Sequence, residues 1–179
     1  MADYSLVKAP SSASSHAGGE AWDNPNNILV QEGNRAISDI PKNGNSQWIR
    51  GYNYNFNIES DATILGIQMR LRLQSENAGN VSDSQVYVTD TGGNNKGGNK
   101  ATGNDWPTSD TDFFYGGSTD LWGASWSVAD INHVNFGAQV EAANSSGTSS
   151  RQARVDYMEI TVYYSRPDAQ GMLLQMGAF

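Results

Sequence analysis

The chain of 179 residues contains no cysteine. This absence excludes disulfides, thiolate metal sites and cysteine nucleophiles together. Positive charge is also scarce, since 11 Lys and Arg stand against 19 Asp and Glu and give a formal net charge of −8. Binding to a nucleic-acid backbone needs clustered Lys and Arg. We therefore expect no nucleic-acid partner.

Long apolar runs are missing as well. None approaches the roughly 18 residues that a membrane-spanning helix needs. The first residues, MADYSLVKAP, lack the basic start and apolar core of a signal peptide. We therefore expect neither a membrane partner nor an export signal. Charged residues make up only 17% of the chain, and its abundance of Gly, Asn, Ser and Thr indicates a turn-rich protein.

What the sequence does contain is alternation of period two. The segment YNYNFNI, at 52–58, places an aromatic or aliphatic residue at every second position and Asn between them. This pattern predicts a strand over 47–58 whose apolar face is buried and whose Asn face is in water. Residues 63–74 alternate most clearly. The intervening ESDA, at 59–62, predicts a hairpin between these two strands.

Further strands are predicted at 28–30, 81–89, 112–115, 135–143 and 154–164. The last of them is rich in β-branched and aromatic residues, so we expect it to lie centrally in its sheet. One helical turn is predicted at 127–133, where Ser127 and Asp130 have the spacing of a capping box. The pattern favours an all-β fold, an antiparallel β-sandwich of jelly-roll type with extended N- and C-terminal arms.

The expected domain organisation follows from composition. Residues 10–19, PSSASSHAGG, are of low complexity, so we expect an extended N-terminal arm over 1–21. The β-sandwich domain then spans 22–165. Residues 166–179 fall outside the strand pattern and are expected to form a C-terminal arm.

Catalytic groups are sparse. The two histidines, His16 and His133, lie far apart in the sequence, and no Ser–His–Asp order with a nucleophile elbow is present. Two distant His residues do not make a metal site. We therefore assign no catalytic residue, no metal and no cofactor.

Four carboxylates gather in one region of the sequence: Asp105, Asp110, Asp112 and Asp120. A pair of carboxylates could hydrolyse a glycoside, and a larger set could hold Ca²⁺. The favoured interpretation is turn chemistry, because Asp accepts hydrogen bonds from its own loop backbone.

Aromatic residues offer a possible glycan site at Tyr115, Trp122 and Trp126. Exposed aromatic rings stack on sugar rings. Burial at the end of the sandwich is the favoured alternative, because large aromatic side chains bury much apolar area.

The C-terminal arm carries the apolar residues Met172, Leu173, Leu174, Met176 and Phe179. Their burial would contribute roughly 8–15 kcal/mol, whereas ordering about 14 residues costs on the order of 14–28 kcal/mol. Side-chain burial alone does not clearly order this arm. We therefore predict that these five residues bind a partner, with main-chain pairing such as strand addition.

Two segments resemble a known family. The run YGGSTDLWGASWSVADINHVNFGAQVEA (115–142), followed by ARVDYMEITVYY (153–164), resembles a β-sandwich domain of tailed-bacteriophage virion proteins. WDNPNNILV (22–30) resembles the start of that domain. The resemblance implies a structural role in a virus particle assembled in the host cytoplasm, and it implies no active-site residue.

On these grounds we predict a non-enzymatic virion protein, foremost a capsid decoration protein that docks through its terminal arms. Its expected partners are other virion proteins, either the major capsid protein or tail and neck proteins. By analogy we expect a homo-oligomer such as a trimer. A tail-fibre or neck attachment protein, and a glycan-binding module for attachment to the host surface, remain alternatives.

Overall fold

The computed structural model describes residues 2–167. The predicted C-terminal arm lies almost wholly outside them, as do its five expected partner-binding residues, Met172, Leu173, Leu174, Met176 and Phe179. Among the described residues, no helix is long and apolar enough to cross a membrane.

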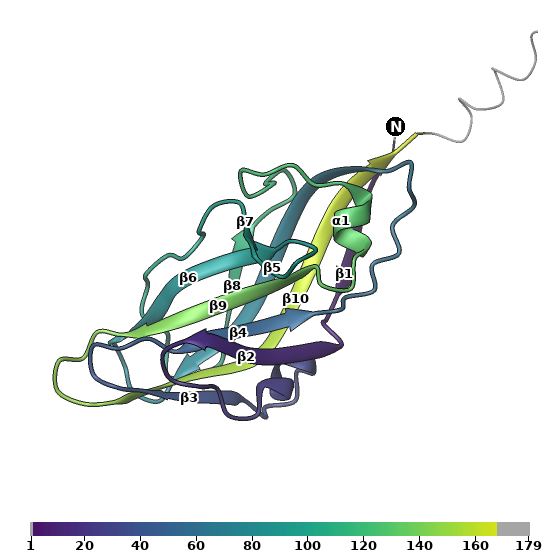
Figure 1. The fold of residues 1–179 in the computed structure, drawn as a ribbon. Coiled ribbons are helices and arrows are strands. Elements are labelled where there is room, and N and C mark those ends of the chain that lie inside the picture. Colours follow the sequence, from purple (N-terminus) through teal and green to yellow (C-terminus); the bar gives the residue numbers. More distant parts are fainter. Residues whose placement is uncertain (1, 168–179) are drawn as a thin grey trace, which may run out of the picture.

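The described part of the chain contains ten strands in two antiparallel sheets (Figure 1). Sheet A has the order β1 (Ala2–Lys8), β10 (Arg151–Arg166), β5 (Thr63–Ser75) and β8 (Thr111–Gly116), and β3 (Ala36–Ile40) also pairs with β10. Sheet B has the order β2 (Ser12–Gly18), β4 (Gln47–Tyr52), β9 (Gly137–Asn144), β6 (Val81–Thr89) and β7 (Asn95–Lys96). Two short helices, η1 (Pro25–Leu29) and α1 (Val128–Asn132), complete the fold.

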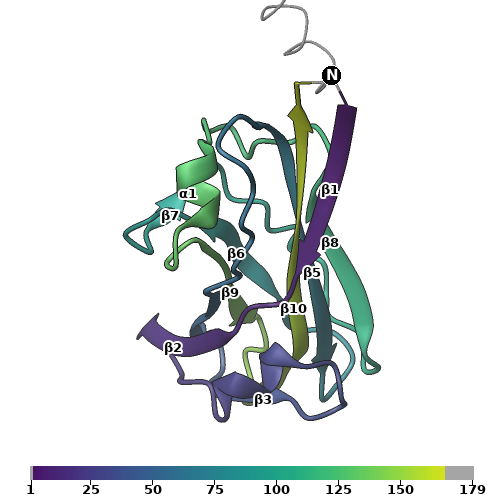
Figure 2. The ribbon, with the colours of Figure 1, turned by 90° about the vertical axis from the view of Figure 1, so that its right-hand side faces the viewer.

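The predicted all-β sandwich is confirmed, and so is the central position of the last strand, because β10 lies between β5 and the pair β1 and β3. From β4 to β6 and from β8 to β10, successive strands alternate between the sheets, as Figure 2 shows from the side. A jelly roll requires such alternation. Assignment to that type stays a prediction.

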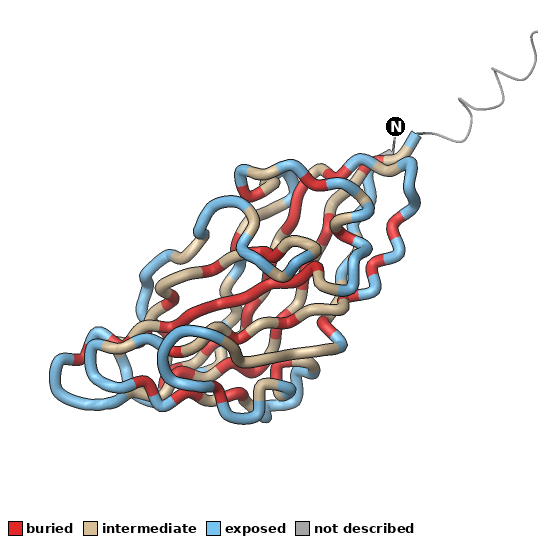
Figure 3. The backbone as a smooth tube through the Cα atoms, viewed as in Figure 1, coloured by how far each residue is buried: buried red, intermediate tan, exposed pale blue. Residues whose placement is uncertain are grey.

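The core forms where the inward positions of the two sheets meet. In β5, the alternation predicts the burial pattern: Ile67, Met69, Leu71 and Leu73 are fully buried, and the intervening residues are partly exposed. In β9, by contrast, the outward residues are buried too, so this strand is covered on both sides (Figure 3). The side chains that cover its outer side make up the candidate site.

The expected N-terminal arm is paired within the domain. Residues 2–8 form β1 along β10, and residues 12–18 form β2 along β4. Main-chain pairing depends little on side-chain type at a sheet edge, so a Ser-rich segment can supply an edge strand. Tyr4 adds a side-chain contact, because its ring stacks on that of Tyr164 at 5.6 Å between centroids.

The YNYNFNI segment has the predicted faces but not the predicted strand. Tyr54, Phe56 and Ile58 are buried, and the Asn face is open, yet β4 ends at Tyr52. The three Asn of the segment have left-handed backbone with φ between 52° and 61°, a conformation that Asn tolerates. The predicted hairpin with residues 63–74 is also wrong, because β4 and β5 belong to different sheets.

One further strand prediction was wrong, and the predicted helical turn was correct. Residues 28–30 form no strand; they overlap η1, whose first turn contains Pro25, a residue that favours helix starts. The adjoining β3 was not predicted. The capping box at Ser127 and Asp130 is confirmed, with both reciprocal hydrogen bonds present.

Candidate binding face

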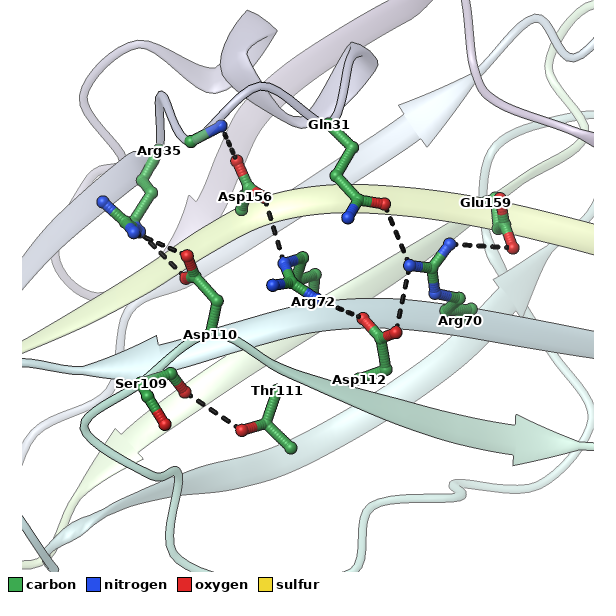
Figure 4. Close-up of polar contacts among 11 residues, drawn as sticks. Gln31, Arg35, Arg70, Arg72, Ser109, Asp110, Thr111, Asp112, Asp156 and Glu159 are labelled. Carbon is green, nitrogen blue, oxygen red and sulfur yellow. Dashed lines mark hydrogen bonds and ion pairs between the residues drawn. The ribbon is translucent and has the colours of Figure 1, made fainter.

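The outer face of sheet A carries a network of ion pairs (Figure 4). Arg35 makes a bidentate contact with Asp110, with Nε–Oδ1 and Nη2–Oδ2 distances of 2.9 and 2.6 Å. Asp112 lies between Arg70 and Arg72, at 3.0 and 3.2 Å. Two of the four aspartates that sequence reasoning considered for catalysis or Ca²⁺, Asp110 and Asp112, are thus held by guanidinium groups.

The same network continues onto β10. Asp156 sits at a register shift between Val155 and Tyr157, and its side chain is 2% exposed. Its carboxylate accepts a hydrogen bond from the Gly33 N–H at 2.9 Å and lies 3.3 Å from Arg72. Glu159 pairs with Arg70 at 3.3 Å. Every acidic side chain of the network therefore has a cationic partner.

The pKa values of two of these carboxyls, Asp110 and Asp156, are shifted in opposite directions. The hydrogen bond from Arg35 holds the pKa of Asp110 below its ordinary value. Burial raises the pKa of Asp156, although its hydrogen bond from Gly33 acts in the other direction.

The remaining two aspartates lie apart from this network. Asp120 pairs with Lys100 at 2.6 Å, and Asp105 makes a backbone bridge to Ser82. Asp105, Asp110, Asp112 and Asp120 therefore do not form one site, as the disfavoured glycosidase or Ca²⁺ interpretation would require. Within residues 2–167, no group of three His, Asp or Glu is arranged to hold a metal ion.

The predicted glycan-binding aromatics are in the core. Tyr115, Trp122 and Trp126 are 3%, 1% and 9% exposed. The indole N–H groups of Trp122 and Trp126 donate to the carbonyls of Ile67 and Leu121, each at 2.9 Å. Because their rings are covered, a sugar cannot stack on them, and the glycan assignment of these three residues is corrected to core packing.

Two other aromatic side chains are accessible, on the outer face of sheet B. Trp48 on β4 and Tyr87 on β6 are both partly exposed. Their in-sheet neighbours Ile49, Val86 and Val88 are fully buried, so alternation points both rings away from the core. The ring centroids are 6.0 Å apart with an interplanar angle of 58°. Since β9 lies between β4 and β6, the two rings meet above β9.

Two polar side chains of β9 lie beneath this pair. Gln139 is 3% exposed and Glu141 is 6% exposed, although both face outward. Gln139 pairs across its strand with Arg50 on one side and Tyr87 on the other. Its Oε1 accepts from His16 Nε2 at 3.2 Å, and its Nε2 donates to Asn95 Oδ1. The amide is thus fixed by residues from both edges of the sheet.

Glu141 is held by neutral donors. Its Oε2 accepts hydrogen bonds from Asn45 Nδ2, Ser84 Oγ and Gln85 Nε2, at 3.1, 2.8 and 2.9 Å. No described Lys, Arg or His forms an ion pair with this carboxylate. We call the set His16, Trp48, Tyr87, Gln139 and Glu141 the sheet B binding face.

This face can stack and hydrogen-bond at once. Aromatic rings beside a few fixed polar groups are the usual composition of a small-molecule or sugar site. Sequence reasoning missed Trp48 and Tyr87, but a signal was present. In QVYVT and SQWIR each aromatic residue occupies the phase opposite to the apolar core positions. An aromatic on the polar phase of a strand indicates an exposed ring.

No protein-family model and no curated protein sequence matches the chain. Among solved structures, the chain is similar to the enzymatically active domain of tailspike protein 4 of bacteriophage CBA120. That similarity has 12% sequence identity and a TM-score of 0.38, and it covers 89% of this chain. The chain spans about a fifth of the matched one, 19%.

The comparison corrects one expectation. We predicted a non-enzymatic protein from the sequence, and the matched chain is described as an enzymatically active domain. The prediction of a non-enzymatic protein is therefore withdrawn.

Proposed function

We propose that the protein is a tail-related attachment protein of a bacteriophage particle that binds carbohydrate through the sheet B binding face. The observation that carries the proposal is the pair of accessible rings, Trp48 and Tyr87, above the buried polar side chains of Gln139 and Glu141. The link to a phage particle is supported by the sequence resemblance of residues 115–142 and 153–164.

The chemistry of the face suits a sugar ring. A pyranose presents C–H groups on its faces and hydroxyl groups at its edge. Trp48 and Tyr87 touch each other, so they offer one joint surface for stacking rather than a slot between them. The hydroxyl groups at the sugar's edge then meet His16, which is partly exposed and contacts Gln139 Oε1, and the 6% of Glu141 that is exposed; both side chains are already fixed by hydrogen bonds. Such preorganised groups lose little conformational entropy on binding.

The two terminal segments take different parts in this proposal. The N-terminal strands pair within the domain, so docking through them has lost its basis. The C-terminal residues Met172, Leu173, Leu174, Met176 and Phe179 are proposed to anchor the domain to another virion protein. Removing residues 168–179 should then abolish incorporation into particles while leaving sugar binding unchanged. Capsid decoration and a trimeric state stay predictions.

Glycan-array screening, followed by calorimetric titration of each hit, tests the proposal. Trp48→Ala should weaken binding by about five- to tenfold, the effect of losing one aromatic contact of about 1 kcal/mol or more. The matched control is Phe114→Ala, which removes an aromatic side chain that is 58% exposed on the other face and should leave binding unchanged. Absence of any glycan ligand, or equal affinities of wild type and Trp48→Ala, would refute the proposal.

A further inference from the structure

Glu141 differs from the other buried acids in combining neutral partners with a place on an accessible face. Asp156 has Arg72 beside it, and Asp83, although its partners are neutral, is bound from an exposed loop by the backbone N–H and hydroxyl of Thr102. Glu141 instead lies on an accessible face, and its partners among the described residues are all neutral. A carboxylate that is removed from water without a cation is costly. A ligand that carries a positive charge would complete the site.

The open position is one specific oxygen. All three side-chain donors bind Oε2, so Oε1 accepts no hydrogen bond from a described residue. Oε1 faces Gly18, where an added Cβ would lie 3.4 Å from it. Gly18 has φ of +94°, which other residues adopt only with strain. Glycine at this position therefore keeps the approach to Oε1 free of a side chain.

The aromatic rings of this face also favour a positively charged ligand. Ile49 pairs with Val140, so Trp48 lies one step along β4, beside Glu141 on the outer face. Ring faces attract ammonium groups, most strongly those of Trp. Arg50, the neighbouring cation on β4, is turned elsewhere: it donates to the Asn135 carbonyl, and its guanidinium lies 4.9 Å above the Tyr52 ring.

From this geometry we infer that the sheet B binding face selects an amino sugar, with the sugar's ammonium group on Glu141 Oε1 and its ring on Trp48 and Tyr87. The inference rests on the proposed function and names its ligand class. The expected order of affinity is amino sugar first, neutral sugar second and acidic sugar last. A carboxylate-bearing sugar is disfavoured because its charge would meet that of Glu141.

The test uses three β-1,4-linked tetrasaccharides of equal length, built from glucosamine, N-acetylglucosamine or glucose, and the full-length protein at pH 6. We expect the glucosamine oligomer to bind about five- to tenfold more tightly than the other two, as a charge-assisted hydrogen bond does over a neutral one. Raising the salt concentration to 0.5 M should shrink this preference.

Two variants separate the contributions. Glu141→Gln, with an unchanged melting temperature, should bring the three affinities to within about twofold of each other, because the amide keeps its size and loses its charge. Glu159→Gln, the matched change on sheet A, should keep the preference. Trp48→Ala should weaken all three sugars alike.

The outcomes distinguish the two proposals. Equal affinities for the three sugars in the wild type, or a preference that survives in Glu141→Gln, would overturn the amino-sugar inference and leave carbohydrate binding standing. Absence of binding by all three oligomers together with an empty glycan array would overturn both.

Discussion

The two outer faces of the sandwich differ in how their polar groups are partnered. On sheet A, Arg35, Arg70 and Arg72 pair with carboxylates from two other segments, residues 110–112 and β10. On sheet B, the Glu141 carboxylate is held by neutral donors alone, under two accessible rings. A face whose charges are satisfied within the chain has little to gain from a ligand. A face with an open acceptor beside aromatic rings does gain from one.

Aromatic exposure alone does not separate the two faces. Phe114 on sheet A is more than half exposed, yet its register partner is Arg70, which is already committed to Asp112 and Glu159. Trp48 and Tyr87 stand beside groups with remaining hydrogen-bonding capacity. An exposed ring alone therefore does not identify a binding face. The polar groups beside the ring must also have hydrogen bonds left to form.

The largest effect is expected below both faces, in the core. Trp122→Ala should lower the free energy of unfolding by about 3–5 kcal/mol, because it removes a large buried side chain and the surrounding core cannot move in to fill the cavity. Denaturant unfolding measures this loss. Should Trp122→Ala instead be as stable as the wild type and lose sugar binding, the binding face would have to be sought around Trp122.

The next effect is expected on sheet A. Asp156→Ala leaves the Gly33 N–H without its acceptor and Arg72 without one of its two anions, so stability should fall by about 2–3 kcal/mol. Sugar affinity should not change. Calorimetric titration and thermal unfolding on the same variant check both statements, and a loss of affinity would show that the two faces are coupled.

On sheet B we expect a smaller effect, in which sugar affinity falls and stability changes little. Tyr87→Ala should weaken sugar binding by about fivefold, because it removes half of the stacking surface. Stability should fall by no more than about 1 kcal/mol, since the ring is partly exposed. Parallel titration and unfolding of Phe114→Ala provide the control. A stability loss without an affinity loss would make Tyr87 a structural cover for β9 only.

The smallest effect is a pH dependence. Arg35 lowers the pKa of Asp110 in the folded protein, so this pair stabilises the fold above the ordinary Asp range near pH 4 and loses that contribution as the pH falls further. Asp110→Asn should cost at most about 1 kcal/mol at pH 7, because the pair is partly exposed. Unfolding curves at pH 7 and pH 2 should show this difference between the two proteins disappearing in acid.

Local periodicity was enough to predict much of the fold. The sandwich, the burial pattern of β5 and the capping box at Ser127 follow from alternation and side-chain spacing within short segments. The N-terminal strands could not be predicted, because a Ser-rich edge strand gains its order from its neighbour's main chain. YNYNFNI does not form a strand because its three Asn residues adopt left-handed backbone, which cannot continue the hydrogen-bond ladder of a sheet.

The candidate site was less accessible to sequence reasoning. For Trp122 and Trp126 the sequence left a sugar site open beside the favoured burial in the core, and the structure buries both. Glu141 has no distinctive sequence context. Its significance depends on Asn45, Ser84 and Gln85, which the sheet brings together from two other parts of the chain. Long-range pairing of this kind leaves no local pattern.

The pairing of β1 with β10 has a consequence for how the molecule is made. Ala2 lies opposite Arg166, and Lys8 lies opposite Ile160, so the two strands meet at the end of the molecule marked N in Figure 1. β1 is synthesised before β10, so it has no partner strand until almost the whole domain has been synthesised. Contacts of such long sequence separation slow folding. Until β10 is synthesised, β1 and the edge of β5 that pairs with β10 both have unpaired main-chain groups, which can pair with other nascent chains.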